Sequence, residues 1–462
     1  MSEGRAWGAL LVLCIASRLL GAIHYVEDLD SLRFALAVVD YDVARLQPHF
    51  PAYPVFCFAA KAIHALTGRY APAFAVLGGL STLAILFFTL GLARIRLASP
   101  TGLIAAFLLL FNPLLWLMSN RWMPDAMGAA FVLASLWCLG RPERGKAAWG
   151  SFIAGLTLGV RLSYAPLLLA PLLFRLREPG RRLHLLGAGA AGAALWLVPL
   201  IAVTGWPELV QAAQAQTRGH FTDFGGTLST EPGVLERWAV IFRSLWADGL
   251  GLYWPGRNLL TACTTAALLA VLAAGWRGVA QRLDSGALLG APVIACLLYL
   301  GWIFLFQNVL HKSRHVLPLL PFLALAPAFA GDWIYRQAAR WPRVILAVFL
   351  CCYGCVTLHL VVQHRGPTAI AQVHRHLAAG ETEGLRIVSV PLIKWYLASQ
   401  DLEAEYIPVE SPEDLRAIDP AAAGELVVIG SPLPDREPKA VRTFYHNPYV
   451  NRLWPELVVY EY

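Results

Sequence analysis

Long apolar segments recur along most of the chain and are separated by short polar segments. Examples are Phe74–Leu92, Leu103–Met118, Leu259–Ala274 and Val344–Val361. A helix needs about 20 apolar residues to cross a hydrocarbon core of roughly 30 Å. The pattern therefore predicts an all-α polytopic membrane protein. The first apolar run, Leu10–Ile23, lacks a small-residue cleavage site, so we interpret it as an uncleaved first span.

Basic residues gather in the short segments between apolar runs, as is typical of cytoplasmic loops. If all of these clusters face the cytoplasm, the spans between them come in pairs. Segment 51–67 is apolar but contains two prolines, Lys61 and His64, so we predict an interfacial helix there. This reasoning gives about eleven spans. Their limits are 8–25, 73–93, 101–118, 125–140, 147–160, 163–175, 183–203, 258–276, 285–306, 315–334 and 343–362.

The same topology brings the polar segments to one side of the membrane. They are 26–50, 119–124, 204–257, 307–314 and the tail after Gln363. We expect the membrane to be the bacterial inner membrane, with the site and the C-terminus on its periplasmic side.

The tail changes composition, with fewer long apolar runs and more acidic residues. Four short segments in it read as strands and Pro367–Gly380 reads as a helix. The strand segments are LRIVSVP, LEAEYIPV, GELVVIGSP and LWPELVVYEY. We predict a transmembrane domain over 1–363, with outer loops 26–72 and 204–257, and a small extramembrane α/β domain over 364–462.

Composition adds two exclusions. The chain is 57% hydrophobic and only 15% charged, which is well below the roughly 25% of soluble proteins. Its net charge of +7 arises mainly in the short loops, without a basic stripe with aromatics, so we do not expect nucleic-acid binding. The eight cysteines lie in apolar segments without a paired CxxC motif, which argues against a zinc site or a disulfide framework.

The stretch Tyr25–Pro54 contains an unusual density of carboxylates beside two apolar regions. Acids are costly next to lipid, so such a cluster is a candidate functional site. An amphipathic helix over Ser31–Arg45 would put Asp30 and Arg33 on one face, capped by Ser31 or Asp30. Asp30 could equally be a helix cap beside solvated acids. The acids are Glu27, Asp28, Asp30, Asp40 and Asp42.

Other candidates lie in the remaining outer segments. Pro124 and Asp125 open a span, where both residue types are also ordinary helix-start signals. Lys312 and Arg314 lie just outside a span on the side where positive charge is disfavoured, which favours an anionic ligand over simple snorkelling. Arg161, at another outer span end, is a cation of the same kind.

The long outer loop contains Arg218, His220 and Asp223 amid glycine and threonine. His220 could be a ligand or base, or an ordinary loop histidine. Gly225 and Gly226 indicate a tight turn or a close backbone approach.

In this order, the motifs resemble those of the membrane-embedded GT-C glycosyltransferases, which include protein O-mannosyltransferases and the aminoarabinose transferases of lipid A. Those families have an acidic pair in the first outer loop, and Asp30 with Ser31 fits this frame. His49–Tyr53 fits their next segment, Asp125 a later acid, and Lys312–Pro321 a late basic motif. The resemblance covers about residues 1–335. Ser31 replaces the second acid of the pair, so either Glu27 or Asp28 compensates for it or the pair binds no metal.

The resemblance implies inverting transfer of a sugar from a polyprenyl-phosphate donor to an acceptor hydroxyl on a lipid, glycan or protein. Asp30 is then the candidate general base, and Asp125 orients the acceptor or shares that role. Lys312, Arg314, Arg161 and His49 are candidates for binding the donor phosphate.

Residues Asp28, Arg33, His220 and Asp223 are acceptor or loop candidates. A divalent metal could take part at this site.

Other classes stay open. A lipid-sugar flippase or transporter would place ionisable groups near the middle of its spans, whereas these candidates lie at span ends. A ligase or polymerase of surface glycans would use the loop 204–257 more heavily. A non-catalytic scaffold would explain why Ser31 stands where the family has an acid.

Overall fold

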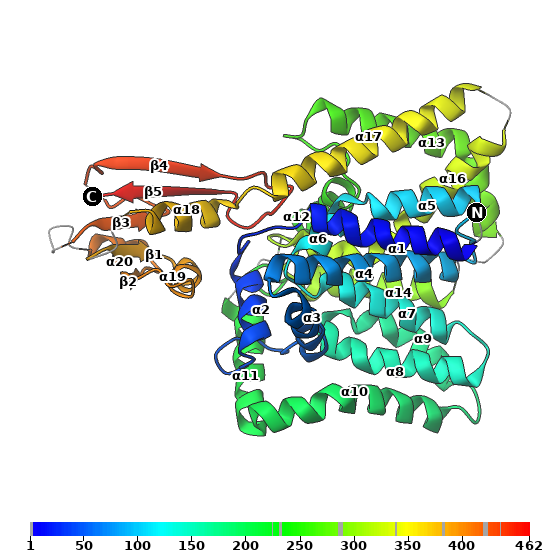
Figure 1. Cartoon of the computed structure of the whole chain (residues 1–462), viewed down its shortest axis with the longest axis horizontal. Helices are drawn as coiled ribbons and strands as arrows, with labels where there is room; N and C mark the ends of the chain where they lie inside the picture. Colours follow the sequence, from blue (N-terminus) through cyan, green and yellow to red (C-terminus); the bar gives the residue numbers. More distant parts are fainter. Residues whose placement is uncertain are drawn as a thin grey trace.

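The chain folds into a helical bundle with a small sheet at one end (Figure 1). The computed structural model describes residues 3–462 except 224, 231–232, 285–289, 338–339, 381–383, 419–423 and 435. The helices that form the bundle lie side by side along one direction (Figure 1). They are α1 (Glu3–Leu20), α4 (Tyr70–Leu92), α5 (Pro100–Leu110), α6 (Pro113–Asn120), α7 (Asp125–Leu139), α8 (Arg144–Val160), α9 (Pro166–Leu176), α10 (Arg182–Thr204), α13 (Leu259–Asp284), α14 (Ala291–Phe306), α16 (Leu325–Arg336) and α17 (Arg340–His364).

Several of these helices have the length and apolarity to cross a membrane. Within the described residues, 5 helical segments pass that test, or 6 if the bent pair α5–α6 is one span. The chain is therefore an integral membrane protein of mainly helical fold. Each expected span overlaps a helix, while α7, α9 and α14 are shorter apolar helices. The number of about eleven spans stays a prediction.

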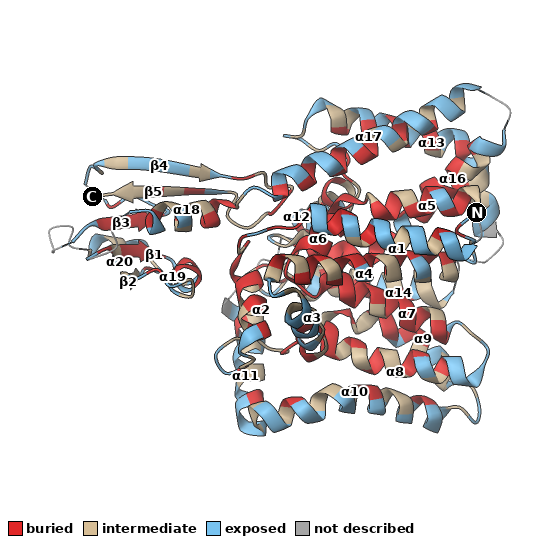
Figure 2. Ribbon diagram, viewed as in Figure 1, coloured by how far each residue is buried: buried red, intermediate tan, exposed pale blue. Residues whose placement is uncertain are grey.

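Burial separates the interior of the bundle from its lipid-facing surface. In the apolar window of α4, 67% of residues are buried, against 11% in that of α10. Figure 2 shows the contrast, with buried residues gathered on α4 and α7 and exposed ones along α10. Because α10 is apolar yet exposed, its outer side suits contact with lipid.

The segment that was expected to span the membrane as one helix over 101–118 is broken. Its halves, α5 and α6, meet at a 53° bend. Pro113 cannot donate a helical hydrogen bond, and Asn112 caps the second half by accepting from the amide of Leu115 at 2.9 Å. The fully buried Arg18 donates to the carbonyl of Leu110 at 3.2 Å. Side chains from neighbouring elements thus satisfy the backbone groups that the break releases.

Short helices cross the end of the bundle that carries the sheet, hereafter the sheet end. They are α2 (Leu29–Val39), α3 (Pro54–Thr67) and α11 (Trp206–Arg218). The N-terminus lies at the opposite end (Figure 1). The segment expected as an interfacial helix forms α3, which buries Phe56 and Cys57. Two expectations about α2 were wrong: its cap is Asp28, and it ends at Val39 because Asp40 is already extended.

The chain returns to the sheet end through η2 (Gly219–Asp223), α12 (Val234–Arg243), η3 (Ser244–Gly249), η4 (Ser313–Leu319) and α15 (Leu320–Leu323). A short turn, η1 (Leu162–Tyr164), links α8 to α9. The predicted close approach at Gly226 is present, because this residue has a φ of +80° and packs against the side chain of Asn308.

The C-terminal segment forms a five-stranded sheet with the order β2-β1-β3-β5-β4. The strands are β1 (Arg386–Ser389), β2 (Glu405–Pro408), β3 (Leu426–Ile429), β4 (Ala440–Tyr445) and β5 (Glu456–Glu461). β1 pairs in parallel with β2 and β3, and β5 is antiparallel to β3 and β4. The helices α18 (Ala369–Ala378), α19 (Pro391–Ala398) and α20 (Pro412–Arg416) accompany it. The four expected strands and the expected helix are confirmed, whereas β4, α19 and α20 were not predicted.

Candidate active site

Asp30 lies in the first turn of α2 at the sheet end. The Asp28 side chain caps this helix by accepting from the amide of Ser31 at 2.8 Å, so Asp28 positions the turn. The Oδ2 atom of Asp30 lies 2.9 Å from Nζ of Lys312 and 2.7 Å from Nη2 of Arg314. The structure thus joins the predicted base directly to the two predicted phosphate-binding cations, although about 280 residues separate them in sequence.

The charges around Asp30 set its ionisation. Burial alone would raise the pKa of this carboxyl, but Lys312 and Arg314 outweigh burial and hold the pKa well below its ordinary value. Asp30 is therefore a carboxylate at neutral pH. Its side chain is 15% exposed, which leaves it accessible to a small group.

A second buried ion pair is formed by Asp125 and Arg161. Asp125 is the first residue of α7, where the positive end of the helix dipole favours a carboxylate. Its Oδ1 lies 3.0 Å from Nη2 of Arg161, and the two side chains are 0% and 5% exposed. Neither carboxylate oxygen accepts a well-aligned hydrogen bond within the described part of the chain. A buried carboxylate with spare acceptor capacity is unusual and marks a candidate functional group.

The turn before α7 brings the two ion pairs together. Met123 lies in this turn, and its Sδ contacts Nη1 of Arg314, which also binds Asp30. Arg314 also interacts electrostatically with both Asp30 and Asp125. The five predicted residues Asp30, Asp125, Arg161, Lys312 and Arg314 therefore lie within electrostatic reach of one another, and they are called the acid–cation cluster hereafter.

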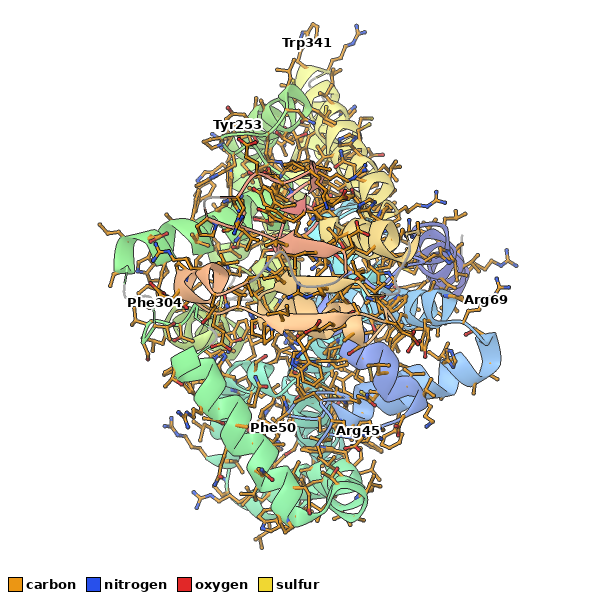
Figure 3. The ribbon with its side chains drawn as sticks, turned by 90° about the vertical axis from the view of Figure 1, so that its left-hand side faces the viewer. Arg45, Phe50, Arg69, Tyr253, Phe304 and Trp341 are labelled. Atoms are coloured by element: carbon orange, nitrogen blue, oxygen red, sulfur yellow. The ribbon has the colours of Figure 1, made fainter. Side chains whose placement is uncertain are left out.

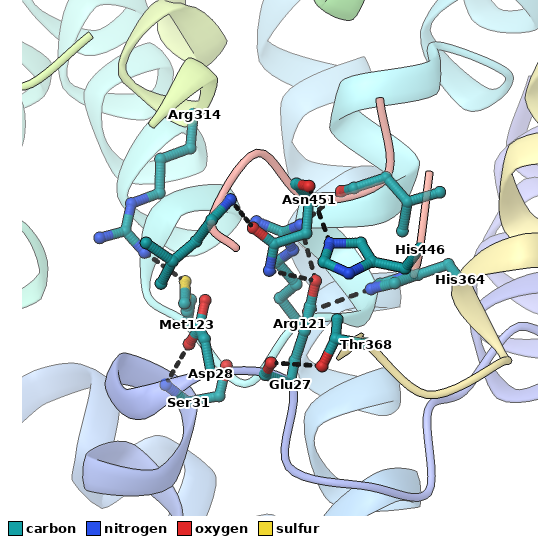
Figure 4. A network of polar contacts seen from close by, with 12 residues as sticks. Glu27, Asp28, Ser31, Arg121, Met123, Arg314, His364, Thr368, His446 and Asn451 are labelled. Carbon is teal, nitrogen blue, oxygen red and sulfur yellow. Dashed lines mark hydrogen bonds and ion pairs between the residues drawn. The ribbon is translucent and has the colours of Figure 1, made fainter. Parts of the chain in front are cut away.

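Glu27 is the centre of a second network, which the sequence did not reveal (Figure 4). Its carboxylate is completely buried and lies 2.7 Å from Nη2 of Arg121 and 3.0 Å from Nε2 of His364. The amide of Asn451 donates to the same carboxylate at 3.0 Å, and the hydroxyl of Thr368 donates to the Glu27 carbonyl at 2.8 Å. Glu27 thus joins the loop before α2, the turn before α7, the end of α17 and the C-terminal segment.

The network is saturated with partners. Burial alone would raise the pKa of Glu27, but Arg121 and His364 lower it to about 2. His446 connects to the same site, since it accepts from the amide of Ala369 at 2.9 Å and its Nε2 donates to the carbonyl of Asn451 at 2.9 Å. Glu27 is therefore positioned to fix the two loops that present Asp30 and Asp125.

The contacts of Glu27 and Asp28 show whether either residue can replace the acid that is missing at Ser31. The expectation that Glu27 or Asp28 compensates for it does not fit, because the Glu27 carboxylate binds Arg121 and His364 and Asp28 caps α2. Within the described residues, no group of three or more His, Cys, Asp or Glu side chains is arranged to hold a metal ion. The expected pair has one carboxylate, Asp30, and it is already paired with two cations, so this donor set does not fit a divalent metal.

A further anchor ties the β4–β5 loop to the bundle. Arg452 forms an ion pair with Asp248 of η3, and both side chains are almost completely buried. The ring of Tyr449 lies 4.3 Å from the guanidinium of Arg257. The loop 446–452 is therefore anchored by Arg452 and Tyr449 to the bundle and by Asn451 to Glu27.

Two predicted residues lie close to Asp30 without pairing with it. His49 interacts with the Tyr53 hydroxyl at 3.3 Å. Burial lowers the pKa of His49 to about 3, although the Asp30 charge opposes this. His49 is thus neutral at pH 7 and offers a hydrogen bond rather than a positive charge. Arg33 is half-buried on the same helix, and burial lowers its pKa despite the nearby Asp30.

His220, a candidate of the long loop, contacts a backbone carbonyl rather than the acid–cation cluster. The ring of His220 hydrogen-bonds the carbonyl of Phe306 at 2.6 Å, as expected of a structural loop histidine. The side chain of Asp223 lies outside the described residues. The buried Arg237 organises this loop by donating to the carbonyls of Phe304 and Gly226, each at 2.8 Å. Phe304 is labelled in Figure 3, which views the molecule from the sheet end with the strands across the centre.

No protein-family model and no curated protein sequence matches the chain. Solved structures do match. ArnT from Cupriavidus metallidurans bound to undecaprenyl phosphate is 12% identical with a TM-score of 0.53, covering 100% of this chain and 98% of that one. The arabinofuranosyltransferase AftD from Mycobacteria is 17% identical with a TM-score of 0.50, covering 97% of this chain and 39% of that one. The expected resemblance to the GT-C glycosyltransferases is thus confirmed for the fold.

Proposed function

We propose that the chain is a GT-C glycosyltransferase that moves a sugar from a polyprenyl-phosphate donor to an acceptor hydroxyl. The observation that carries the proposal is the direct contact of Asp30 with Lys312 and Arg314 at 2.9 and 2.7 Å. It brings together a carboxylate that could accept a proton and two cations that could stabilise a phosphate leaving group. The likeness in fold to ArnT, whose structure contains undecaprenyl phosphate, supports the donor class.

In this mechanism Asp30 accepts the proton of the acceptor hydroxyl as its oxygen attacks the anomeric carbon. The bond between that carbon and the phosphate oxygen breaks, and the lipid phosphate leaves with the electron pair. Lys312 and Arg314 stabilise the negative charge that develops there. A single displacement of this kind inverts the anomeric configuration. Asp125, held by Arg161, orients the acceptor.

Donor binding would also activate the base. Without a donor, both cations bind Asp30, which makes it a weak proton acceptor. A phosphate that competes for Lys312 and Arg314 draws them away from Asp30 and raises its proton affinity. The donor therefore binds before the acceptor is deprotonated, which limits reaction of an unloaded site.

We also propose that the sheet end faces the periplasm of a bacterial inner membrane. This orientation places the acid–cation cluster and the C-terminal domain, residues 364–462, on the outer side of the transmembrane domain. The basic loops at the opposite end support it. Single cysteines at Arg218 and Gln400 in intact cells should react with an impermeant reagent, and protection of both would contradict this orientation.

The function is tested by transfer from a radiolabelled polyprenyl-phosphate sugar with purified protein. We expect Asp30→Asn and Asp125→Asn to lower transfer by about 100-fold or more, as for loss of a general base or a positioning group. Asp332→Asn, on the opposite end of the bundle, is the matched control and should keep full transfer. Full transfer by both site variants would refute the assignment.

A further inference from the structure

A polar pocket lies where the β4–β5 loop meets the bundle. Its volume is about 270 Å³, and it is enclosed by the N-terminal part of α13, the C-terminal part of α17 and residues 445–449. It shares no lining residue with the acid–cation cluster. Its principal polar and aromatic lining residues are Arg257, His359, Gln363, Tyr445, Asn447 and Tyr449.

The lining favours a neutral ligand over an anion. No carboxylate lines the pocket among the described residues, and Arg257 is its one guanidinium. That guanidinium already donates from Nη1 to the carbonyls of Ala247 and Leu252 and lies over the ring of Tyr449. The remaining polar groups are mainly amides and hydroxyls. A phosphate site would instead gather several cations, as the acid–cation cluster does.

The polar groups form a short chain across the pocket. The amide of Asn447 donates to Oε1 of Gln363 at 2.7 Å, and Nε2 of Gln363 lies 3.0 Å from Nε2 of His359. Tyr449 adds a buried hydroxyl that has no hydrogen-bond partner among the described residues. Amide side chains both donate and accept hydrogen bonds, as do the adjacent hydroxyls of a sugar. The two tyrosines supply apolar faces that also carry a hydroxyl.

We propose that this pocket binds a sugar ring of the acceptor, as a site remote from the reacting atoms. Its volume is just below the roughly 300–1,000 Å³ of pockets for larger ligands, so it suits one small ring. The ligand class follows from the lining, while its identity as part of the acceptor rests on the proposed function. Binding here would hold a glycan or glycolipid while another of its hydroxyls reaches Asp30.

The loop around the pocket gives such binding a route to the acid–cation cluster. Asn447 and Tyr449 face the pocket, and Asn451 of the same loop donates to the Glu27 carboxylate at 3.0 Å. A sugar that contacts this loop would also stabilise the network that fixes Asp30. Sugar binding in the pocket would thus help to hold Asp30 in position.

The test is saturation-transfer NMR on the full chain in an amine-oxide detergent, because a sugar detergent would compete. The probes are the methyl glycosides of glucose, galactose and mannose, with sn-glycerol 3-phosphate as a lipid-headgroup probe. At least one glycoside should bind, and Gln363→Leu and Tyr445→Ser should each weaken it by about fivefold, as for one lost hydrogen bond. Tyr445 is 59% exposed, so its replacement leaves the core intact.

The matched controls are Gln281→Leu, another exposed glutamine on a bundle helix, and Tyr335→Ser, whose side chain is 58% exposed. Both should bind the glycoside as the wild type does. Asp30→Asn should lose transfer yet keep glycoside binding, which separates this inference from the proposed function. The inference is overturned if no glycoside binds, if the pocket variants bind it normally, or if sn-glycerol 3-phosphate alone binds.

Discussion

Replacing Glu27 by glutamine tests whether the buried network joins the C-terminal segment to the site. The substitution keeps the size of the side chain and removes its charge. Arg121, which is 8% exposed, then stays buried without its ion-pair partner, although it still donates to the Val450 carbonyl. His364 and Asn451 lose a charged acceptor at the same time. The structure therefore predicts a large loss of stability from one nearly isosteric change.

The size of the loss follows from the pKa of Glu27. Burial alone would raise it, but Arg121 and His364 lower it from the ordinary 4.5 to about 2. A depression of that size corresponds to about 3 kcal/mol of stability. Because the folded pKa is the lower one, this stability is present above about pH 4.5 and disappears as the pH falls towards 2. Breaking a buried ion pair by removing one partner costs about 3–5 kcal/mol, which agrees.

The assay is thermal unfolding of detergent-solubilised protein, followed by tryptophan emission from pH 7 to pH 3, with hydrogen exchange of the loop 446–452. At pH 7 Glu27→Gln should unfold at a clearly lower temperature, and exchange in the loop should accelerate by about 100-fold. The control is Glu143→Gln, whose ion pair with Lys146 is exposed, and its effect should stay within about 1 kcal/mol.

Two outcomes would refute this reasoning. Glu27→Gln could prove as stable as the Glu143→Gln control, or its deficit could persist unchanged at pH 3. The first would mean that the network adds no net stability. The second would mean that the loss has another cause than the charge of Glu27.

Two further predictions concern single contacts. Lys312→Gln removes one of the two cations that lower the pKa of Asp30, so this pKa should rise. Because the base must be deprotonated, the acid limb of the pH–rate profile should then move to higher pH. An unchanged limb would contradict the role of Lys312. Gly226→Ala should lower stability by about 1–3 kcal/mol or more in thermal unfolding, because φ is +80° and the new Cβ would lie 2.2 Å from Asn308. Gly256→Ala, with φ +89° and open space, is its control and isolates the backbone strain; equal losses would refute the clash.

The acid–cation cluster could be predicted because its residues stand out locally. Asp30, Asp125 and Lys312 are charged groups at the ends of apolar runs, where charge is costly without a role. The alternation of basic loops then placed them at one end of the bundle. The exact pairing could not be derived, since charge alone does not show that Arg161 pairs with Asp125 and Arg314 with Asp30.

The Glu27 network could not be predicted, because its partners are remote in sequence. Arg121, His364 and Asn451 lie in three different segments, and each has an ordinary local context. Glu27 itself looked like one of several acids in a loop. Its role comes from the docking of the C-terminal segment, which no periodic pattern describes.

Local signals explain two smaller errors. Asn112 and Pro113 are typical residues for the start of a new helix, a cap followed by a proline. The apolar residues around them nevertheless suggested one continuous span. Strand β4 was missed because it is mostly exposed, with Val441 54% exposed, and so lacks an alternating apolar face.

The central claim is that Asp30 is the base and that Lys312 and Arg314 bind the donor phosphate. It is tested most directly by measuring undecaprenyl-phosphate affinity and the transfer rate together in Asp30→Asn. Removing the carboxylate frees both cations, so the account predicts unchanged or tighter lipid-phosphate binding with transfer reduced by about 100-fold or more. An Asp30→Asn protein that transfers sugar at the wild-type rate, or that loses lipid-phosphate binding, would contradict it.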